Sequence, residues 1–268
     1  MTETISIENR DGTQTSARIA GNVGSQAIVL LHGIGADHRM WDPQIQVLSQ
    51  NGYYVLAPDL LGHGKTSKVS ELNLENWEDQ LLELLFYAGV SKCILVGVSM
   101  GGVIAQSFAM NYPEKIHKLI LADTFGELKT CREKVLGFLQ ITAYSILKVS
   151  GHKILAKGME LTYKAPFAHM AKEYFCQMSL TADFEQLILA RKAINKIKAI
   201  GKIDGDQIST LVLVGHQSGK SFVEINRKIA DAITGSRFVI LKNSMDPSNL
   251  VNETDFNREV LQFLQNPT

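Results

Sequence analysis

The residues Gly97-Val98-Ser99-Met100-Gly101 have the types and the spacing of a serine nucleophile placed on a sharp turn. An apolar run, Cys93 to Val96, precedes them, and a helix-like segment, Val103 to Asn111, follows them. Such a strand-to-helix turn lifts its serine above the edge of a sheet, and its glycines let neighbouring backbone pass close by. The pattern predicts Ser99 at a helix N-terminus, where backbone N–H groups point at the group that it attacks.

The elements that would position Ser99 alternate between strands and helices. Apolar runs predict strands buried on both faces, preceded by an opening hairpin of Thr4–Ile7 and Ser16–Ala20. The buried strands are predicted at Ala27–Leu31, Tyr54–Ala57, Cys93–Val96, Lys118–Ala122, Thr210–Val214 and Phe238–Leu241. Helices are predicted at Trp41–Gln50, from an Asn73 cap to Ala88, and at Val103–Asn111, Phe222–Ala232 and Phe256–Leu264. This order predicts the α/β fold class, with a doubly wound, mostly parallel sheet.

Residues 125–202 interrupt the alternation because they carry no strand signal. Helical periodicity appears around Val135–Val149, Ala168–Met178 and Phe184–Ile200. We therefore predict an all-helical lid at 125–202, inserted after the sixth strand into an α/β core of residues 1–124 and 203–268. A lid there covers the sheet edge at which open α/β folds bind ligands. Side chains that either line a substrate pocket under the lid or form its own core are Phe125, Met159, Phe167, Met170, Tyr174, Phe175 and Met178.

Three further motifs, together with the serine turn, resemble those of the α/β-hydrolase superfamily. Leu31-His32-Gly33-Ile34-Gly35 follows the first buried strand, as the oxyanion loop does. Asp59-Leu60-Leu61-Gly62-His63-Gly64-Lys65-Thr66 resembles the Asp-x-x-Gly-His-Gly-x-Ser turn, and Leu121-Ala122-Asp123-Thr124 resembles the usual end of the following strand. Outside the lid, nearly the whole chain is similar to small bacterial esterases and lactonases, such as the 3-oxoadipate enol-lactonases.

The resemblance implies a site and a substrate class. The oxyanion hole would consist of the backbone N–H groups of Ile34 and Met100, and such donors stabilise the charge of the transition state. The loop residues His32 and Gly33 would face the substrate, although a structural role in holding the loop backbone suits His32 better. The substrate would be a small, mostly apolar ester, lactone or related carbonyl compound.

The positions of the usual catalytic acid and base hold other residues. Family members carry the acid in Gly-x-x-Asp after the strand that here is Leu211–Val214, and this chain reads Gly215-His216-Gln217-Ser218. Anchored on Asn249-Leu250, the histidine position is Asp246, and no histidine follows His216. The expected triad thus becomes Ser99, Ser218 and Asp246. Losing a triad member typically lowers the rate about 10⁴- to 10⁶-fold.

Three functions are compatible with this altered triad. The first is a serine hydrolase whose base lies elsewhere, either His216 with Asp123 as a possible acid, or a histidine of a loop or the lid (His38, His152 or His169). The second is a non-hydrolytic enzyme of the isomerase, cyclase or lyase kind. There Asp246, with its pKa raised under an apolar lid, would be the general acid or base. The third is an inactive pseudo-hydrolase that binds a small ligand or a protein.

The composition excludes several other classes. Twenty-seven basic side chains balance twenty-seven acidic ones, so no overall field attracts nucleic acid or anionic lipid. No apolar run approaches the roughly 20 residues of a membrane span, and the N-terminus has no signal-peptide pattern. Three widely spaced cysteines favour a reduced, cytoplasmic protein. Without a clustered ligand set or a phosphate-binding glycine loop, we predict no metal and no cofactor, in a monomer or homodimer.

Overall fold

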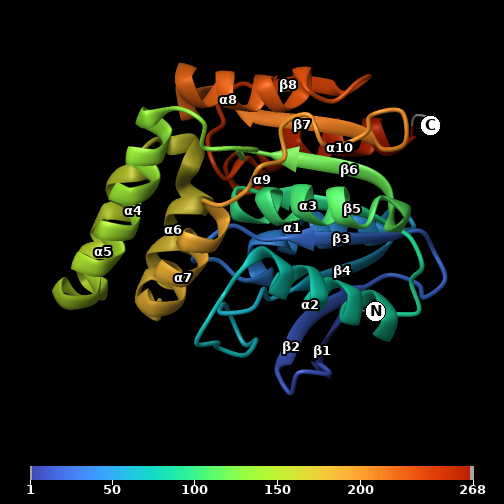
Figure 1. Cartoon of the computed structure of the whole chain (residues 1–268), viewed down its shortest axis with the longest axis horizontal. Helices are drawn as coiled ribbons and strands as arrows, with labels where there is room; N and C mark the ends of the chain where they lie inside the picture. The colour runs from blue at the N-terminus through green and yellow to red at the C-terminus, as the bar shows by residue number, and fades with distance from the viewer. Residues whose placement is uncertain (1, 266–268) are drawn as a thin grey trace.

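The computed structural model describes residues 2–265, which form one eight-stranded sheet with helices on both faces (Figure 1). The strands are β1 (Thr2–Glu8), β2 (Gln14–Ala20), β3 (Ala27–Leu31), β4 (Tyr54–Pro58), β5 (Cys93–Val98), β6 (Ile116–Ala122), β7 (Ser209–Gly215) and β8 (Arg237–Leu241). Their order across the sheet is β1-β2-β4-β3-β5-β6-β7-β8. The pairs β1–β2 and β2–β4 are antiparallel, and the remaining pairs are parallel. The predicted doubly wound, mostly parallel sheet and its opening hairpin are confirmed.

Burial on both faces explains the continuous apolar runs of the central strands. Alternate residues of β3 point to opposite faces. Val29 and Leu31 pack with one cluster, which includes residues of α2 (Leu74–Tyr87), α3 (Met100–Asn111) and α8 (Lys220–Asp231). Ile28 and Leu30 pack with the other, which includes residues of α1 (Asp42–Gln50) and α10 (Glu253–Gln265). The predicted cap is also present, because the Asn73 side chain accepts a hydrogen bond from the backbone of Asn76 at 2.8 Å.

A helical insertion follows β6, as predicted, and stands at one end of the sheet (Figure 1). It contains α4 (Cys131–Ser150), α5 (His152–Thr162), α6 (His169–Ser179) and α7 (Phe184–Ile194). Its exact limits, 125–202, stay a prediction. Among residues 2–265, no helix has the length and apolarity that crossing a bilayer requires.

Two details of the insertion differ from the prediction. Helix α5 was not predicted from the sequence, and it is separated from α4 by Gly151 at a φ of 91°. Helix α7 ends at Ile194 and does not continue to Ile200. The chain turns back there, because Ala199 N–H donates to the carbonyl of Gly126 at 2.8 Å and Lys198 forms a β-bridge with Glu127. This pairing closes the insertion at its base.

Candidate active site

Ser99 occupies a strained turn between β5 and α3. Its φ is 55° and its ψ is −117°, a conformation that a residue with a side chain adopts only when the surrounding structure imposes it. The turn is packed so tightly that only glycine fits beside it. A Cβ on Gly97 would lie 2.3 Å from the carbonyl oxygen of Gly101, and one on Gly101 would lie 2.1 Å from that of Leu31. These contacts explain the Gly-x-Ser-x-Gly spacing.

The loop after β3 passes directly beside Ser99. A Cβ on Gly33 would lie 3.5 Å from the Cβ of Ser99. Within the described residues, the backbone N–H groups of Ile34 and Met100 have no hydrogen-bond partner. Buried or partly buried N–H groups are nearly always paired, so two unpaired donors flanking a serine are an unusual arrangement. They are available to an oxygen atom of a bound molecule.

Asp246, in the loop after β8, faces the hydroxyl group of Ser99. Burial raises the pKa of the Asp246 carboxyl well above its usual value, and the negative charge of Asp123 raises it further. Hydrogen bonding with Ser99 and the positive charge of Arg191 act in the opposite direction, and burial outweighs both. The carboxyl group therefore retains its proton at pH values at which an exposed aspartate is ionised.

Asp123 is the second carboxyl of this site. It follows β6 with a φ of 47°, and its side chain is fully buried. Its oxygens accept hydrogen bonds from the N–H of Gly215 at 2.8 Å and from that of Ser248 at 2.7 Å. Burial raises the pKa of Asp123 despite these donors. Because Asp123 and Asp246 repel each other when both are ionised, they titrate as a pair.

Ser218 contacts the backbone of the Asp246 loop. Its hydroxyl oxygen accepts a hydrogen bond from the N–H of Asp246 at 3.0 Å. Ser218, predicted from the sequence at the acid position, therefore supports the Asp246 loop, while the buried carboxyl beside Asp246 comes from Asp123. The structure brings together Ser99, Asp246 and Ser218, the three residues of the predicted altered triad.

The comparisons with known proteins agree with this architecture. Residues 26–150 match the family model described as alpha/beta hydrolase fold. A solved hydrolase from Pseudomonas aeruginosa PA01 superposes with a TM-score of 0.83 at 25% identity, over 98% of this chain and 99% of the other. The chain has the α/β-hydrolase fold.

Two curated relatives are similar over about half of this chain. The 3-oxoadipate enol-lactonase 1 of Acinetobacter baylyi is 30% identical over 126 residues, which are 47% of each chain. A putative 2-succinyl-6-hydroxy-2,4-cyclohexadiene-1-carboxylate synthase of Bacillus subtilis is 33% identical over 136 residues, 49% of this chain and 48% of the other. This chain thus spans about half the length of the curated relatives that it matches.

Most of the histidine rings bond to groups other than Ser99, or are exposed. Within residues 2–265, no histidine ring is hydrogen-bonded to Ser99. His216 and His169 are exposed, and the ring of His152 contacts the carbonyl of Ala182 at 2.9 Å. The arrangement therefore gives no support to a relocated histidine base.

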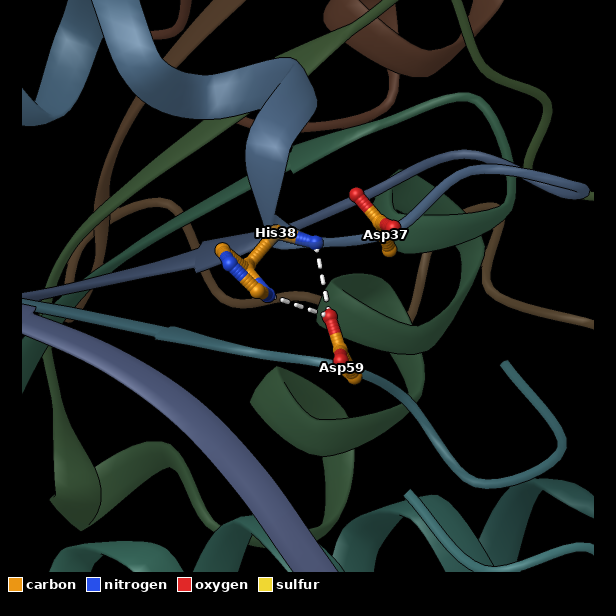
Figure 2. Close-up of side chains that lie close together, drawn as sticks. All are labelled: Asp37, His38 and Asp59. Carbon is orange, nitrogen blue, oxygen red and sulfur yellow. Dashed lines mark hydrogen bonds and ion pairs between the residues drawn. The ribbon is translucent and has the colours of Figure 1, made fainter. Parts of the chain in front are cut away.

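His32 and His38 brace the loop after β3. The Nε2 of His32 accepts a hydrogen bond from Leu60 N–H at 2.9 Å, so Nδ1 carries the proton and donates to Gly33 O at 2.8 Å. The ring is fully buried, which favours the structural role of His32 over a substrate contact. His38 Nδ1 lies 2.7 Å from Asp59 Oδ1, and the backbone N–H of His38 donates to the same oxygen at 2.8 Å (Figure 2).

Asp37, His38 and Asp59 form a cluster with the side-chain types of a metal site, which the sequence did not predict (Figure 2). They line a cleft of about 460 Å³, whose lining does not include Ser99 or Asp246. Protein donors already bind the carboxylates. Asp59 also accepts from Lys65 N–H at 2.8 Å, and Asp37 is paired with Arg39 at 2.7 Å. Although burial opposes ionisation, these donors hold the pKa of both acids below its usual value, and we interpret the cluster as a structural brace.

The predicted lid residues pack mainly against the core. Phe125 is buried, and Met170 is partly buried. The predicted residues that pack against the cluster on the α1 and α10 face are Met159, Phe167, Tyr174 and Phe175. The Tyr174 hydroxyl accepts a hydrogen bond from Asp37 N–H at 2.8 Å, so it ties α6 to the loop after β3.

Three polar residues of the insertion were missed from the sequence. Tyr163 donates its hydroxyl to the carbonyl of Asp246 at 3.1 Å. The Arg191 guanidinium lies 5.3 Å from the ring centroid of Phe125, and its charge acts on both Asp246 and Tyr144. The Nε of Arg191 is buried without a partner, and the described residues give Arg191 no ion pair. These residues lie on separate elements of the insertion, so only the folded chain brings them to Asp246.

Proposed function

We propose that this protein hydrolyses a carboxylic ester or lactone, with Ser99 as the nucleophile and Asp246 as the acceptor of its proton. The observation that carries the proposal is the contact of the Ser99 hydroxyl with the Asp246 carboxyl, beside the unpaired N–H groups of Ile34 and Met100. The fold and the similarity to an enol-lactonase support the reaction class.

The proposed reaction has two displacement steps. The Ser99 oxygen attacks the carbonyl carbon while its proton passes to ionised Asp246, and the Ile34 and Met100 N–H groups bind the developing oxyanion. Asp246 then returns the proton to the departing alkoxide, which leaves an acyl-serine. Water then attacks the acyl-serine while Asp246 accepts a proton from it. Asp246 returns this proton to the departing Ser99 oxygen, and the carboxylic acid is released. Asp123 stays fixed by its two backbone donors throughout.

The raised pKa of Asp246 sets the pH range of this chemistry. Only the ionised carboxyl accepts the Ser99 proton, and burial beside Asp123 favours the protonated form. We therefore expect a hydrolysis rate that increases with pH above the range in which an exposed aspartate ionises. The rate stays below that of a histidine-assisted esterase, because burial beside Asp123 keeps the ionised fraction of Asp246 small.

The role of Ser99 is tested by Ser99→Ala with a short-chain p-nitrophenyl ester. We expect the hydrolysis above the buffer rate to fall by at least about 100-fold, because Ser99 is the nucleophile that the two unpaired N–H donors flank. Ser107→Ala is the matched control, since Ser107 is buried on α3 and its hydroxyl binds Glu78. A rate that survives in Ser99→Ala would contradict the proposal.

The unpaired Arg191 guanidinium suggests that the substrate carries a negatively charged group. A largely buried guanidinium without an anionic partner keeps its charge at a cost, which a carboxylate of the substrate would offset. The guanidinium lies 5.3 Å from the centroid of the Phe125 ring, and Arg191 lies close enough to influence Asp246. We therefore propose an ester or lactone that carries a carboxylate, in place of the wholly apolar substrate predicted from the sequence.

A pair of esters tests the role of Arg191. The p-nitrophenyl monoester of succinate carries a free carboxylate, whereas p-nitrophenyl butyrate has a neutral acyl chain of similar length. We expect Arg191→Met to lower kcat/KM for the succinate ester about 10- to 100-fold, the equivalent of one charge-assisted hydrogen bond, and to leave the butyrate ester nearly unchanged. Equal losses for both esters would show that Arg191 does not recognise the carboxylate.

A second candidate function follows from the protonated form of Asp246. Burial favours the protonated carboxyl beside Ser99, and this form is suited to donate a proton, as a general acid of a non-hydrolytic reaction would. The similarity to a protein named as a synthase supports this alternative. A fluorophosphonate separates the two, because covalent labelling that Ser99→Ala abolishes is expected of the nucleophile and not of a serine that only positions substrate.

A further inference from the structure

The outer faces of α4 and α5 expose large apolar side chains to solvent. Val135, Leu139 and Ile146 are 55%, 53% and 59% exposed, and Val149 near the end of α4 is 89% exposed. Spacings of four and seven residues place the first three on one face of the helix. The opposite face, with buried Gly137, approaches Asn195 just beyond α7. Helix α4 is therefore amphipathic with an apolar face turned outward, where a surface helix is normally polar.

Helix α5 also exposes apolar side chains, and two lysines lie beside them. Ile154 and Leu161 are 57% and 64% exposed, and Lys153 and Lys157 are exposed beside them. Within residues 2–265, neither lysine has an ion pair. Figure 1 shows α4 and α5 at the outer edge of the molecule, on the side of the insertion away from the sheet. We give the name lid face to eight of the exposed residues of these helices: Val135, Leu139, Ile146, Val149, Lys153, Ile154, Lys157 and Leu161.

The segment that carries the lid face has a charge unlike that of the whole chain. Residues 129–164 contain seven basic side chains and two acidic ones, a net charge of +5, whereas the chain has a net charge of 0. The overall balance therefore conceals a basic segment, in which Lys148 is paired with Glu185 of α7. Apolar side chains interleaved with lysines on one exposed face are the pattern of helices that lie on anionic lipid.

We propose that the lid face docks on an anionic lipid surface, with its apolar side chains in the acyl region and its lysines at the headgroups. A second copy of the chain is the less favoured occupant. A two-fold contact through this face would bring two segments of charge +5 together, and like charges repel. Anionic headgroups instead neutralise the lysines while the acyl region receives the apolar side chains.

Sedimentation with lipid vesicles tests the proposal on the full chain. We expect binding to vesicles of mixed phosphatidylcholine and phosphatidylglycerol, weaker binding to phosphatidylcholine alone, and release as salt is raised. Combining Leu139→Ser with Ile146→Ser removes apolar contacts, and combining Lys153→Glu with Lys157→Glu reverses charge. Each pair of changes should lower the partition coefficient about tenfold or more, because apolar burial and electrostatic attraction both contribute to such binding.

Matched controls replace residues of the same types outside the lid face. Val23 is 77% exposed and Lys220 is exposed, so Val23→Ser and Lys220→Glu should leave the partition coefficient unchanged. Circular dichroism and the melting temperature show whether each variant is folded. Absence of binding to the anionic vesicles, or equal losses in the control variants, would overturn the proposal. So would a protein dimer that ultracentrifugation detects and that Leu139→Ser with Ile146→Ser dissociates, because the lid face would then bind a second copy.

Discussion

At the scale of single residues, the site places two buried carboxyl groups, those of Asp123 and Asp246, near Ser99. Asp246 faces Ser99, and the charge of Asp123, whose two oxygens accept backbone hydrogen bonds, acts on Asp246. The two carboxyl groups repel each other when both are ionised, so each raises the free-energy cost of ionising the other. The folded structure must offset this cost to keep them close. Ionisation of Asp246 therefore affects both the proposed reaction and the stability of the folded protein.

This linkage makes a prediction about Asp246→Asn. In the unfolded chain Asp246 ionises near its ordinary pKa, whereas the folded chain retains the proton to a higher pH. The folded state of the parent therefore loses stability as pH rises above the unfolded pKa, at about 1.4 kcal/mol for each unit by which the two pKa values differ. Asparagine cannot ionise and avoids this loss.

We expect the Asp246→Asn protein to match the parent in free energy of unfolding near pH 4 and to exceed it increasingly toward pH 8. Urea unfolding at a series of pH values measures this difference. Asp206→Asn, which replaces an exposed carboxylate, is the matched control. A stability difference that shrinks as pH rises would mean that the folded protein favours ionised Asp246.

The sequence predicted some of these residues and could not predict others. Ser99 lies within a local pattern, and Asp246 and Ser218 follow strands whose ends meet at one sheet edge, so their register was sufficient to place them. The proximity of Asp123 to Asp246 depends on the course of the loop after β8. Arg191 and Tyr163 come from separate parts of the insertion, and the local sequence does not indicate that their side chains lie near Asp246.

At the scale of elements, the Tyr174 hydroxyl connects the insertion to the loop that flanks Ser99. Tyr174 lies on α6, and Asp37 lies in the loop after β3, which also contains Ile34. We expect Tyr174→Phe to cost about 1 kcal/mol of stability, the typical value of one hydrogen bond. Because the loop loses a tether, we also expect a severalfold lower kcat/KM for a p-nitrophenyl ester.

Tyr112→Phe is a suitable control, since Tyr112 contacts Phe108 within the core and lies outside the insertion. Thermal melts and steady-state kinetics of the two variants are compared with those of the parent. Loss of stability without a change in kcat/KM would show that the tether supports the fold alone.

The elements themselves followed from the sequence to different degrees. Strand β3 was predicted with its observed bounds, because burial on both faces leaves a continuous apolar run. Helix α7 was predicted too long, since the helical periodicity continues past Ile194 while the Glu127–Lys198 pairing redirects the chain. Helix α9 (Ser248–Val251) is too short for a periodic signal. Non-local contacts thus decided the bounds that the local pattern could not.

At the scale of the whole molecule, the sheet and the insertion have different tasks. The sheet fixes Ser99, Asp123 and Asp246 at the ends of β5, β6 and β8. The insertion supplies Arg191 above the site and the lid face on its outer side. The net charge of 0 for the whole chain does not reveal the basic segment of the insertion, because acidic residues elsewhere balance it.

The central claim is that a carboxyl group, and no histidine, takes the proton of Ser99. It is tested most directly by kcat/KM for a short-chain p-nitrophenyl ester from pH 5 to 9, in the parent, in Asp246→Asn, and in the double variant Asp246→His with Ser218→Asp. We expect a slow parent rate that rises with pH, loss of that rise in Asp246→Asn, and a rate at least about 100-fold higher in the double variant. An Asp246→Asn protein that keeps the rate and pH profile of the parent would contradict the claim.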